Sequence, residues 1–345
     1  MSNRNPAVTL RDVASAAGVD VSTVSRVLQN KGRVADETRQ RILQTARKLG
    51  YHGNPVARAL KTARASTLLM VVPQIENPIF AAAIIGAEAE ARKSGYALLV
   101  SYDQGDGRKV IADISRYSMI GGVIIASFDD DENLRRTLAA TPQPHVILNR
   151  HLPGDPNCVA IDTRTAARIG VRHLIAQGHR CIGHLAGRLG RFNGDMRCSG
   201  WRDAMADAGL EHGDELIAEA GYSPETVPAA VDRLLEKGVT AIHAATLLTG
   251  VAAIARLHEL GRRVPDEISV VSLHDDLLAR VVYPQLTTVA LPSNEMGRAA
   301  VRRLLGLIHD EMNDAETAAE NAAAPMLLPP GELVVRGSVA PPINL

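Results

Sequence analysis

The chain is poor in aromatic residues and has no long hydrophobic run. Phe, Trp and Tyr make up 3% of its 345 residues, so its core must be mainly aliphatic. No stretch approaches the roughly 18 apolar residues that a membrane-spanning helix needs, and the N-terminus has no apolar signal region. These absences argue against membrane and exported proteins, and we expect a cytoplasmic protein without a membrane partner.

Cysteine is also scarce, and the common catalytic motifs are missing. Cys158, Cys181 and Cys198 form no CxxC pair and have no neighbouring His/Cys set with metal-ligand spacing, which favours structural thiols over a metal site. The sequence contains no P-loop, GxSxG elbow, HExxH motif or GxGxxG after a strand. Four histidines stand among apolar segments and are expected to be core or cap residues: His184, His243, His258 and His274. We therefore expect no enzyme, no metal and no cofactor.

The net charge of zero hides an uneven distribution of charge along the chain. Residues 1–65 contain 12 Lys and Arg residues but only four Asp and Glu residues, which gives a net charge of +8. Residues 66–345 carry 26 basic and 34 acidic residues, a net charge of −8. A basic segment of this kind supplies the salt-sensitive, phosphate-binding part of nucleic-acid affinity.

Residues 9–29 predict two short helices joined by a turn that contains a glycine. Thr9 can cap the first helix, with Asp12 at the third position of a capping box, and Gly18 can end it. Asp20 caps the second helix. This is helix-turn-helix geometry, whose second helix enters the major groove of DNA.

The second helix presents small and polar residues outward, so that its backbone can approach base edges. A third helix is expected over residues 36–49, with Ile42, Leu43, Ala46 and Leu49 facing inward. The alternative is an ordinary helical bundle that does not bind DNA, and the basic charge weighs against it. The DNA contacts predicted here are Thr9, Val21, Ser22, Thr23, Ser25, Arg26, Asn30 and Arg33.

Residues 54–60 predict a second DNA-contacting helix. Asn54 is a good N-cap and Pro55 suits the first helical position, but a helix this short is not stable alone in water. Leu60 has no obvious core to join, as expected of a side chain wedged between base pairs in the minor groove. The alternative is a linker turn with an incidental leucine. The contacts predicted here are Asn54, Val56, Ala57 and Leu60.

From residue 66 onward, apolar runs alternate with helical segments. Strands are predicted at 67–72, 97–102, 122–127, 145–149, 181–185, 241–245 and 268–273, and helices at 79–94, 165–177, 198–208 and 251–260. Repeated βαβ units build open parallel sheets with helices on both faces, and the chain is long enough for two such sheets. Segment 309–325 predicts a solvated helix end or loop.

Residues 8–60, with VTLRDVASAAGVDVSTVSRVL and GYHGNPVARAL, resemble the lac repressor (LacI/GalR) family, and the resemblance covers nearly the whole chain. It implies an α/β fold in which a helix-turn-helix domain and hinge helix precede a two-lobed core like that of periplasmic sugar-binding proteins. The domains expected are 1–53 for the helix-turn-helix, 54–65 for the hinge and linker, and 66–345 for the effector-binding and dimerisation core. Crossovers near residues 162, 290 and 325 would divide the core into lobe 1, about 66–162 and 290–325, and lobe 2, about 163–289 and 326–345.

The same resemblance implies a homodimer on double-stranded operator DNA of pseudo-palindromic sequence. Val21, Ser22 and Arg26 would be the main base-reading residues. Ala57 and Leu60 would enter a kinked central minor groove.

Ligands of open α/β sheets bind beyond the carboxyl ends of the strands. Taken singly, each polar residue at such an end could be a helix cap or loop group, but as a set facing one cleft they predict a small-molecule site. The candidate effector contacts are these residues and the apolar Phe80: Gln74, Asn77, Asp103, Ser127, Asn149, Arg150, Arg197, Tyr222, Thr246, His274 and Asp275.

The resemblance also identifies departures at this site. Arg197, in DMRCSGW, matches the effector-binding arginine of the family, and Tyr222 lies near an aromatic residue that stacks on sugars in some members. However, the usual Asn-Asp pair is Thr246-Leu247 here, and the usual Gly-Phe-Asp-Asp is Ser-Leu-His-Asp at 272–275. The missing amides and carboxylates normally bind sugar hydroxyls, so we expect an acid or a more apolar effector and not an ordinary free sugar.

The sequence therefore predicts a transcriptional repressor whose operator affinity is controlled by a small molecule in the cleft. Two alternatives remain. One is a regulator whose cleft binds nothing, and the other is a solute-binding protein with the same core fold. The DNA-binding segment at the N-terminus argues against the second.

Overall fold

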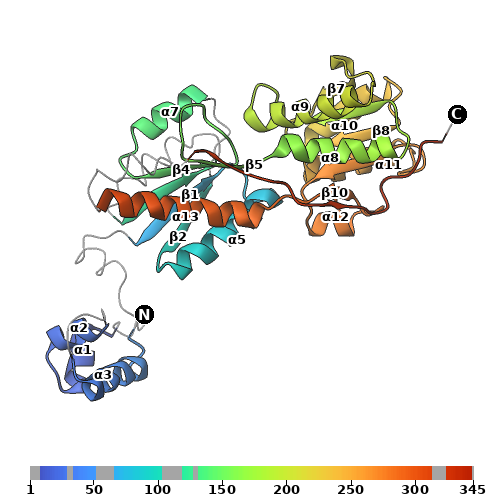
Figure 1. The fold of residues 1–345 in the computed structure, drawn as a ribbon. Helices are drawn as coiled ribbons and strands as arrows, with labels where there is room; N and C mark the ends of the chain where they lie inside the picture. Colours follow the sequence, from blue (N-terminus) through green and yellow to red (C-terminus); the bar gives the residue numbers. More distant parts are fainter. Residues whose placement is uncertain are drawn as a thin grey trace, which may run out of the picture. The chain divides into compact units, whose positions relative to one another are not determined.

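The computed structural model describes residues 8–28, 34–51, 66–102, 119–126, 131–312 and 324–343 (Figure 1). The chain divides into two compact units, Met1–Ser66 and Thr67–Leu345. Among the described helices, none combines the length and the apolar character that crossing a membrane requires.

The first unit contains three helices, α1 (Leu10–Ala17), α2 (Val21–Leu28) and α3 (Asp36–Lys48). The predicted capping box is confirmed: the Asp12 amide donates to the Thr9 hydroxyl at 3.4 Å, and the Thr9 amide donates to the Asp12 carboxylate at 2.7 Å. Gly18 ends α1 with a φ of 64°, the left-handed conformation that glycine adopts most easily. The turn between α1 and α2 therefore has the conformation that the sequence indicates.

The core of the first unit is smaller than the sequence suggested. Val13, Val24 and Ile42 from the three helices are fully buried, but Leu43 and Leu49, expected to face inward, are 37% and 38% exposed. The physical reason is that α3 packs against α1 and α2 on one side only, so its buried stripe is narrow. Leu49 also lies beyond the last helical turn, at the C-cap.

The second unit contains two six-stranded sheets, and we call the halves built on them lobe 1 and lobe 2. Lobe 1 has the order β11-β5-β4-β3-β1-β2, and lobe 2 has the order β12-β10-β9-β8-β6-β7. The strands of lobe 1 are β1 (Thr67–Val72), β2 (Ala97–Tyr102), β3 (Ile120–Ile125), β4 (His145–Leu148), β5 (Cys158–Ile161) and β11 (Met326–Leu328). Those of lobe 2 are β6 (Ile182–Ala186), β7 (Ile217–Glu219), β8 (Ala241–Ala244), β9 (Ser269–Leu273), β10 (Thr287–Val289) and β12 (Leu333–Val334). The predicted parallel sheets are confirmed, and β12 adds an antiparallel edge strand beside β10.

Helices cover both faces of each sheet, which explains why the strands are apolar almost throughout. In lobe 1, Leu68 and Met70 face α5 and α13, whereas Leu69 and Val71 face α7. In lobe 2, Gly170 of α8 lies against His243 and Val271, and α10 and α11 pack on the other side. The helices are α5 (Pro78–Lys93), α7 (Asp131–Ala139), α8 (Thr163–Ala176), α9 (Phe192–Asp207), α10 (Val227–Leu235), α11 (Leu247–Glu259), α12 (Leu277–Val281) and α13 (Ser293–Met312).

The chain passes between the lobes three times. It crosses at Asp162, which caps α8 by accepting from the Thr165 amide at 2.9 Å, and again between β10 and α13. The third crossing follows Leu328, slightly beyond the expected position near 325, because β11 pairs with β5 and so belongs to lobe 1.

Two helices begin earlier than predicted. α9 begins at Phe192 instead of 198, and its N-cap residue, Arg191, makes no side-chain capping hydrogen bond. α11 begins at Leu247 instead of 251, and its capping box pairs Thr246 with another threonine, Thr249. Both starts were missed because neither has the usual capping sequence, in which Ser, Thr, Asp or Asn is followed by Glu or Gln.

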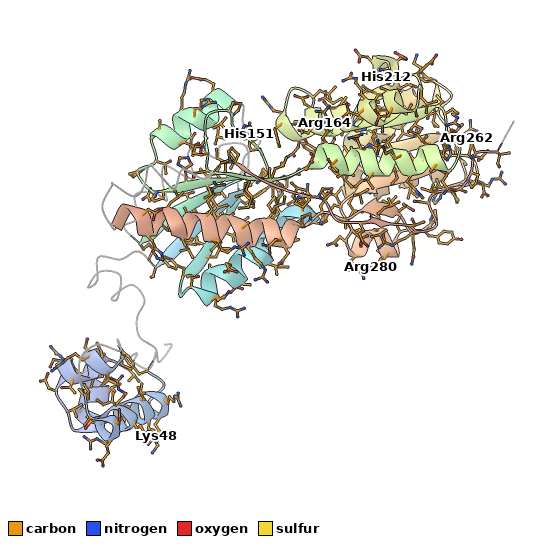
Figure 2. All side chains as sticks on the ribbon, viewed as in Figure 1. Lys48, His151, Arg164, His212, Arg262 and Arg280 are labelled. Atoms are coloured by element: carbon orange, nitrogen blue, oxygen red, sulfur yellow. The ribbon has the colours of Figure 1, made fainter. Side chains whose placement is uncertain are left out.

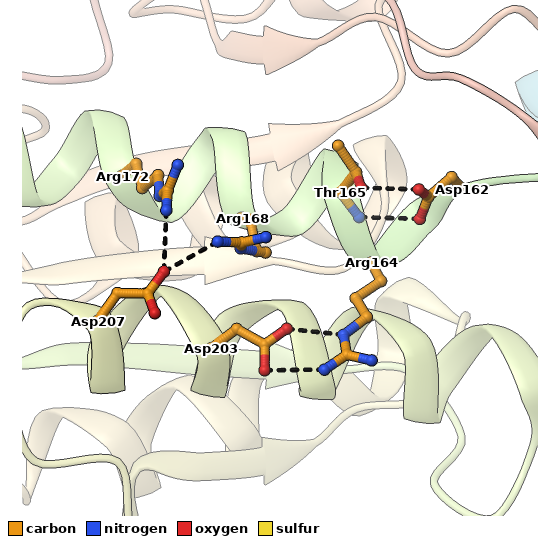
Figure 3. A network of polar contacts seen from close by, with 7 residues as sticks. All are labelled: Asp162, Arg164, Thr165, Arg168, Arg172, Asp203 and Asp207. Carbon is orange, nitrogen blue, oxygen red and sulfur yellow. Dashed lines mark hydrogen bonds and ion pairs between the residues drawn. The ribbon is translucent and has the colours of Figure 1, made fainter.

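A polar ladder joins α8 to α9 on the surface of lobe 2 (Figure 3). The guanidinium of Arg164 donates twice to Asp203, at 2.6 and 2.9 Å, while Arg168 and Arg172 both donate to Asp207, at 2.9 and 2.8 Å. These side chains repeat every four residues on both helices, so their pairing fixes the register of one helix against the other. They are well solvated, and the ladder therefore adds little to the free energy of unfolding.

The core of lobe 2 contains a buried pair of histidines. His184 of β6 and His243 of β8 are register partners with no exposed surface, and their Nδ1 atoms lie 3.0 Å apart. The ring of Trp201 stacks on His184 with centroids 6.0 Å apart. Burial lowers the pKa of His184 to about 3 and holds the pKa of His243 well below its ordinary value, so both rings are neutral at pH 7.

Acid should therefore destabilise the folded chain. When the pH falls below the ordinary histidine pKa of 6.5, both histidines bind protons in the unfolded chain but remain neutral in the folded chain. The free energy of unfolding should fall by up to ~1.4 kcal/mol per pH unit for each histidine. Urea denaturation at successive pH values between neutrality and pH 5 measures this slope. The H184N/H243N double variant should reduce the slope, and the part that remains comes from His173, His179 and His274, whose pKa values burial also lowers. Replacing the exposed His258 should leave the slope unchanged, and a flat profile for the natural chain would contradict the prediction.

Candidate functional site

The outer face of α2 has the character expected of a recognition helix. Val21 and Ser22 are exposed at its N-terminus, Arg26 is exposed one turn later, and Thr23 and Ser25 are half-buried. Asp20 caps the helix by accepting from the Ser22 amide at 2.7 Å. Hydrogen bonds from the side chain and the backbone of Ser22 lower the pKa of the Asp20 carboxyl.

Other predicted contacts differ in how they are placed. Arg26 lies along its own helix, with Nη2 donating to the Ser22 hydroxyl at 3.3 Å. Thr9 is exposed, but its hydroxyl takes part in the capping box. Six further predicted DNA contacts lie outside the described residues: Asn30, Arg33, Asn54, Val56, Ala57 and Leu60.

A cleft lies where the carboxyl ends of strands from both sheets meet. Its empty volume is about 750 Å³, measured out to its open mouth. Eight predicted effector contacts line it: Asn77, Phe80, Asn149, Arg150, Arg197, Tyr222, Thr246 and His274. The strand-end rule therefore located a real concave site.

The structure does not bring Gln74 and Asp275 to the cleft wall. Asp275 is bound by Arg336 at 2.6 Å and by the Thr288 hydroxyl at 2.7 Å, and this pair fastens the last segment of the chain to β10. Gln74 accepts at 3.4 Å from the side-chain amide of Asn77, which does line the cleft. Asp103 and Ser127 lie outside the described residues.

The loop between β6 and α9 and the first turn of α9 add cleft residues that the sequence prediction missed. They are Arg188, Arg191, Phe192 and Asn193. The signal was present, because this loop follows the carboxyl end of a predicted strand. The late predicted start of α9 concealed it. Asn193 also donates from its side-chain amide to the carbonyl of Asn149, which joins lobe 2 to lobe 1 at the cleft.

Two cleft residues adopt a backbone conformation that side chains rarely allow. Asn149 has a φ of 59° and His274 a φ of 79°, and no other non-glycine residue in the described ranges has a positive φ. They follow β4 and β9, which occupy the same place in the strand order of the two sheets. Asn and His tolerate this region better than most residues, and such strain gathers at ligand sites.

Three helices begin at the cleft, and each directs the positive end of its dipole there. Asn77 caps α5 by accepting from the Ile79 amide at 3.3 Å, and Thr246 caps α11 by accepting from the Thr249 amide at 3.2 Å. α9 has no side-chain cap. Of the three, α9 is the helix whose first-turn amides receive no hydrogen bond from the side chain of the N-cap residue.

The charge of the described cleft wall is positive. Arg150, Arg188, Arg191 and Arg197 line it, and none of its described residues is Asp or Glu. Arg197 is only 4% exposed, and its Cζ lies 6.0 Å from the centre of the Tyr222 ring, a cation–π contact. Burial lowers the pKa of Arg197, and burial likewise lowers the pKa of His274.

Comparison with known proteins identifies relatives of both units. Residues 9–54 match the lacI family of bacterial regulatory proteins, and residues 171–339 match the periplasmic binding protein-like domain. The HTH-type transcriptional regulator GalR of Escherichia coli (strain K12) is 33% identical over 305 residues, which cover 87% of this chain and 89% of GalR.

Solved structures agree over the whole length. The lac repressor dimer bound to operator and the anti-inducer ONPF has a TM-score of 0.81 and 26% identity, covering 97% of this chain and 99% of the repressor chain. The complex of the transcriptional regulator CelR with cellobiose has a TM-score of 0.71 and 29% identity, covering 96% of this chain and 99% of CelR. On this evidence the chain belongs to the lacI family of bacterial transcriptional regulators, with a helix-turn-helix unit and a periplasmic-binding-protein-like core.

Proposed function

We propose that the chain is a repressor that binds a pseudo-palindromic operator as a homodimer. Its affinity for the operator changes when a small molecule binds in the cleft. The observation that carries this proposal is the union, in one chain, of an exposed recognition helix with a preformed cleft between two lobes. The domain boundaries proposed with it are 1–53 for DNA binding, 54–65 for the hinge and 66–345 for the core.

On the DNA, Val21, Ser22 and Arg26 would contact bases, because they are exposed on the outer face of α2. Ala57 and Leu60 would enter the minor groove at the centre of the operator, and the other predicted residues would contact the DNA around these positions. The related lac repressor was crystallised as a dimer bound to operator, which supports the proposed partner and stoichiometry.

Control by the ligand follows from the three crossings between the lobes. A molecule that contacts both walls of the cleft stabilises one arrangement of the lobes over another, and it can shift DNA affinity only by its difference in affinity for the two. CelR, a relative of similar fold, forms a complex with cellobiose. The alternative of a cleft that binds nothing is disfavoured by Arg197, because a buried cation without a carboxylate partner destabilises the empty protein.

A second copy of the chain would cover an exposed apolar patch on lobe 2. The patch consists of Leu277 and Val281, one turn apart on α12, and Tyr283 just after it, with exposed fractions of 61%, 65% and 85%. Large apolar side chains gathered in this way mark interaction sites more often than solvated surface.

Selection from a random pool of double-stranded DNA at near-physiological salt tests the DNA-binding proposal. The natural chain should enrich one pseudo-palindrome. R26A should weaken binding to it by about 1–3 kcal/mol and relax the preference at one position of each half-site, since it removes a base contact. R47A removes the same charge from an exposed position on α3 and should keep the preferred sequence. Enrichment of no sequence by the natural chain would count against the proposal.

Replacement of Tyr283 tests the dimer. Y283D places a charge in the apolar patch and should convert a dimer into a monomer, measured as molar mass by light scattering. Its operator affinity should fall because only one half-site is held at a time. L260D, at a partly exposed leucine after α11, is the matched control and should remain dimeric. A dimeric mass for Y283D would exclude this patch as the interface.

A further inference from the structure

We propose that the molecule bound in the cleft is a small organic anion, whose carboxylate or phosphate group binds Arg197 and the N-terminal turn of α9. The inference rests on the proposed function only in taking this cleft as the regulatory site. It narrows the ligand from any small molecule to one chemical class.

The strongest observation is the isolation of the Arg197 guanidinium. It is 96% buried, its Nε has no hydrogen-bond partner, and no carboxylate in the described part of the chain pairs with it. The side chain of Arg336 is 10% exposed, and it is neutralised within the protein by Asp275 at 2.6 Å. The chain thus provides a counter-ion for Arg336 but none, in its described part, for Arg197, which lines the cleft.

The second observation is the bare start of α9, the helix that carries Arg197. Its first-turn amides have no side-chain cap, whereas α5 and α11, which begin at the same cleft, are capped by Asn77 and Thr246. The carboxylate of Asp195, in the first turn of α9, accepts from the Gly190 amide at 2.8 Å and does not line the cleft. Free amides at a helix N-terminus bind oxyanions, because the amide hydrogens and the helix dipole both favour negative charge.

The rest of the wall defines the body of the ligand. Arg188 and Arg191 add positive charge, and an arginine presents donors in the fork geometry that a carboxylate or phosphate matches. The described wall has no carboxylate, and its unpaired acceptors are the side-chain oxygens of Asn149 and Asn193, which can bind hydroxyl groups on the body of the ligand. Much of the remaining lining is apolar: Ile79, Phe80, Leu148, Phe192, Leu247, Leu273 and Leu291. The ligand is therefore an acid with a partly apolar body.

The test is thermal unfolding and calorimetric titration of the full chain with matched probes: glucose, glucuronate, glucose 6-phosphate, benzoate and inorganic phosphate. Inorganic phosphate should raise the Tm above that in chloride of equal ionic strength, and at least one organic anion should bind more tightly than glucose. Comparison of glucuronate and benzoate with glucose 6-phosphate separates a carboxylate ligand from a phosphate ligand.

Two variants make the test decisive. R197M should lower anion affinity about 30-fold or more, since it removes one partner of a desolvated charge pair. It should also raise the Tm of the ligand-free protein, because the unpaired buried charge is gone. R262M is the control, because Arg262 follows α11 and does not line the cleft (Figure 2). R262M should keep the anion response.

An equal phosphate response in R197M and the natural chain would overturn the proposal, as would binding of glucose at least as tight as that of every anion. DNA selection by the ligand-free natural chain is scored separately. Its failure counts against the regulator proposal, while anion binding remains measurable.

Discussion

The two lobes of the core depend on one constraint, which is that the chain passes between them three times. β11 and β12 are the last two strands in the sequence, and they form edge strands of different sheets: β11 of the first and β12 of the second. Neither sheet is complete until β11 and β12 have been added, so neither lobe is built from one continuous segment of the chain. What remains free is the angle at which three connections allow the lobes to meet, and the cleft lies at that junction.

Charge is divided between the two units in a way that suits their different partners. The first 65 residues carry a net charge of +8 and the rest a net charge of −8. Within the acidic core, the described cleft wall is nevertheless positive, with four arginines and no described carboxylate. A local field of this sign inside a body of the opposite sign is maintained by specific side chains, since the average composition of the core would give the reverse.

Local sequence signals predicted those parts of the fold that local interactions determine. β1 and β2 coincide with the predicted strands because each is a short apolar run bounded by turn residues, and Gly18 ends α1 as expected. The starts of α9 and α11 were missed because their caps are unusual. The role of Asp275 could not be predicted, because Arg336, its partner, lies 61 residues away and meets it only after β10 and β12 have paired.

The candidate site shows the same division between local and non-local information. Strand ends predicted Asn149, Thr246 and His274, since the end of a parallel strand is a property of a short segment. Arg197 was predicted both as a strand-end candidate and by the resemblance, but no sequence pattern could show that it lies buried without a counter-ion. That fact depends on which carboxylates reach it, and Asp275, on the strand-end loop that also supplies His274, is held by Arg336 instead. Arg336 thus binds a carboxylate that is adjacent in sequence to the cleft-lining His274, which leaves the positive charge of Arg197 for a ligand to neutralise.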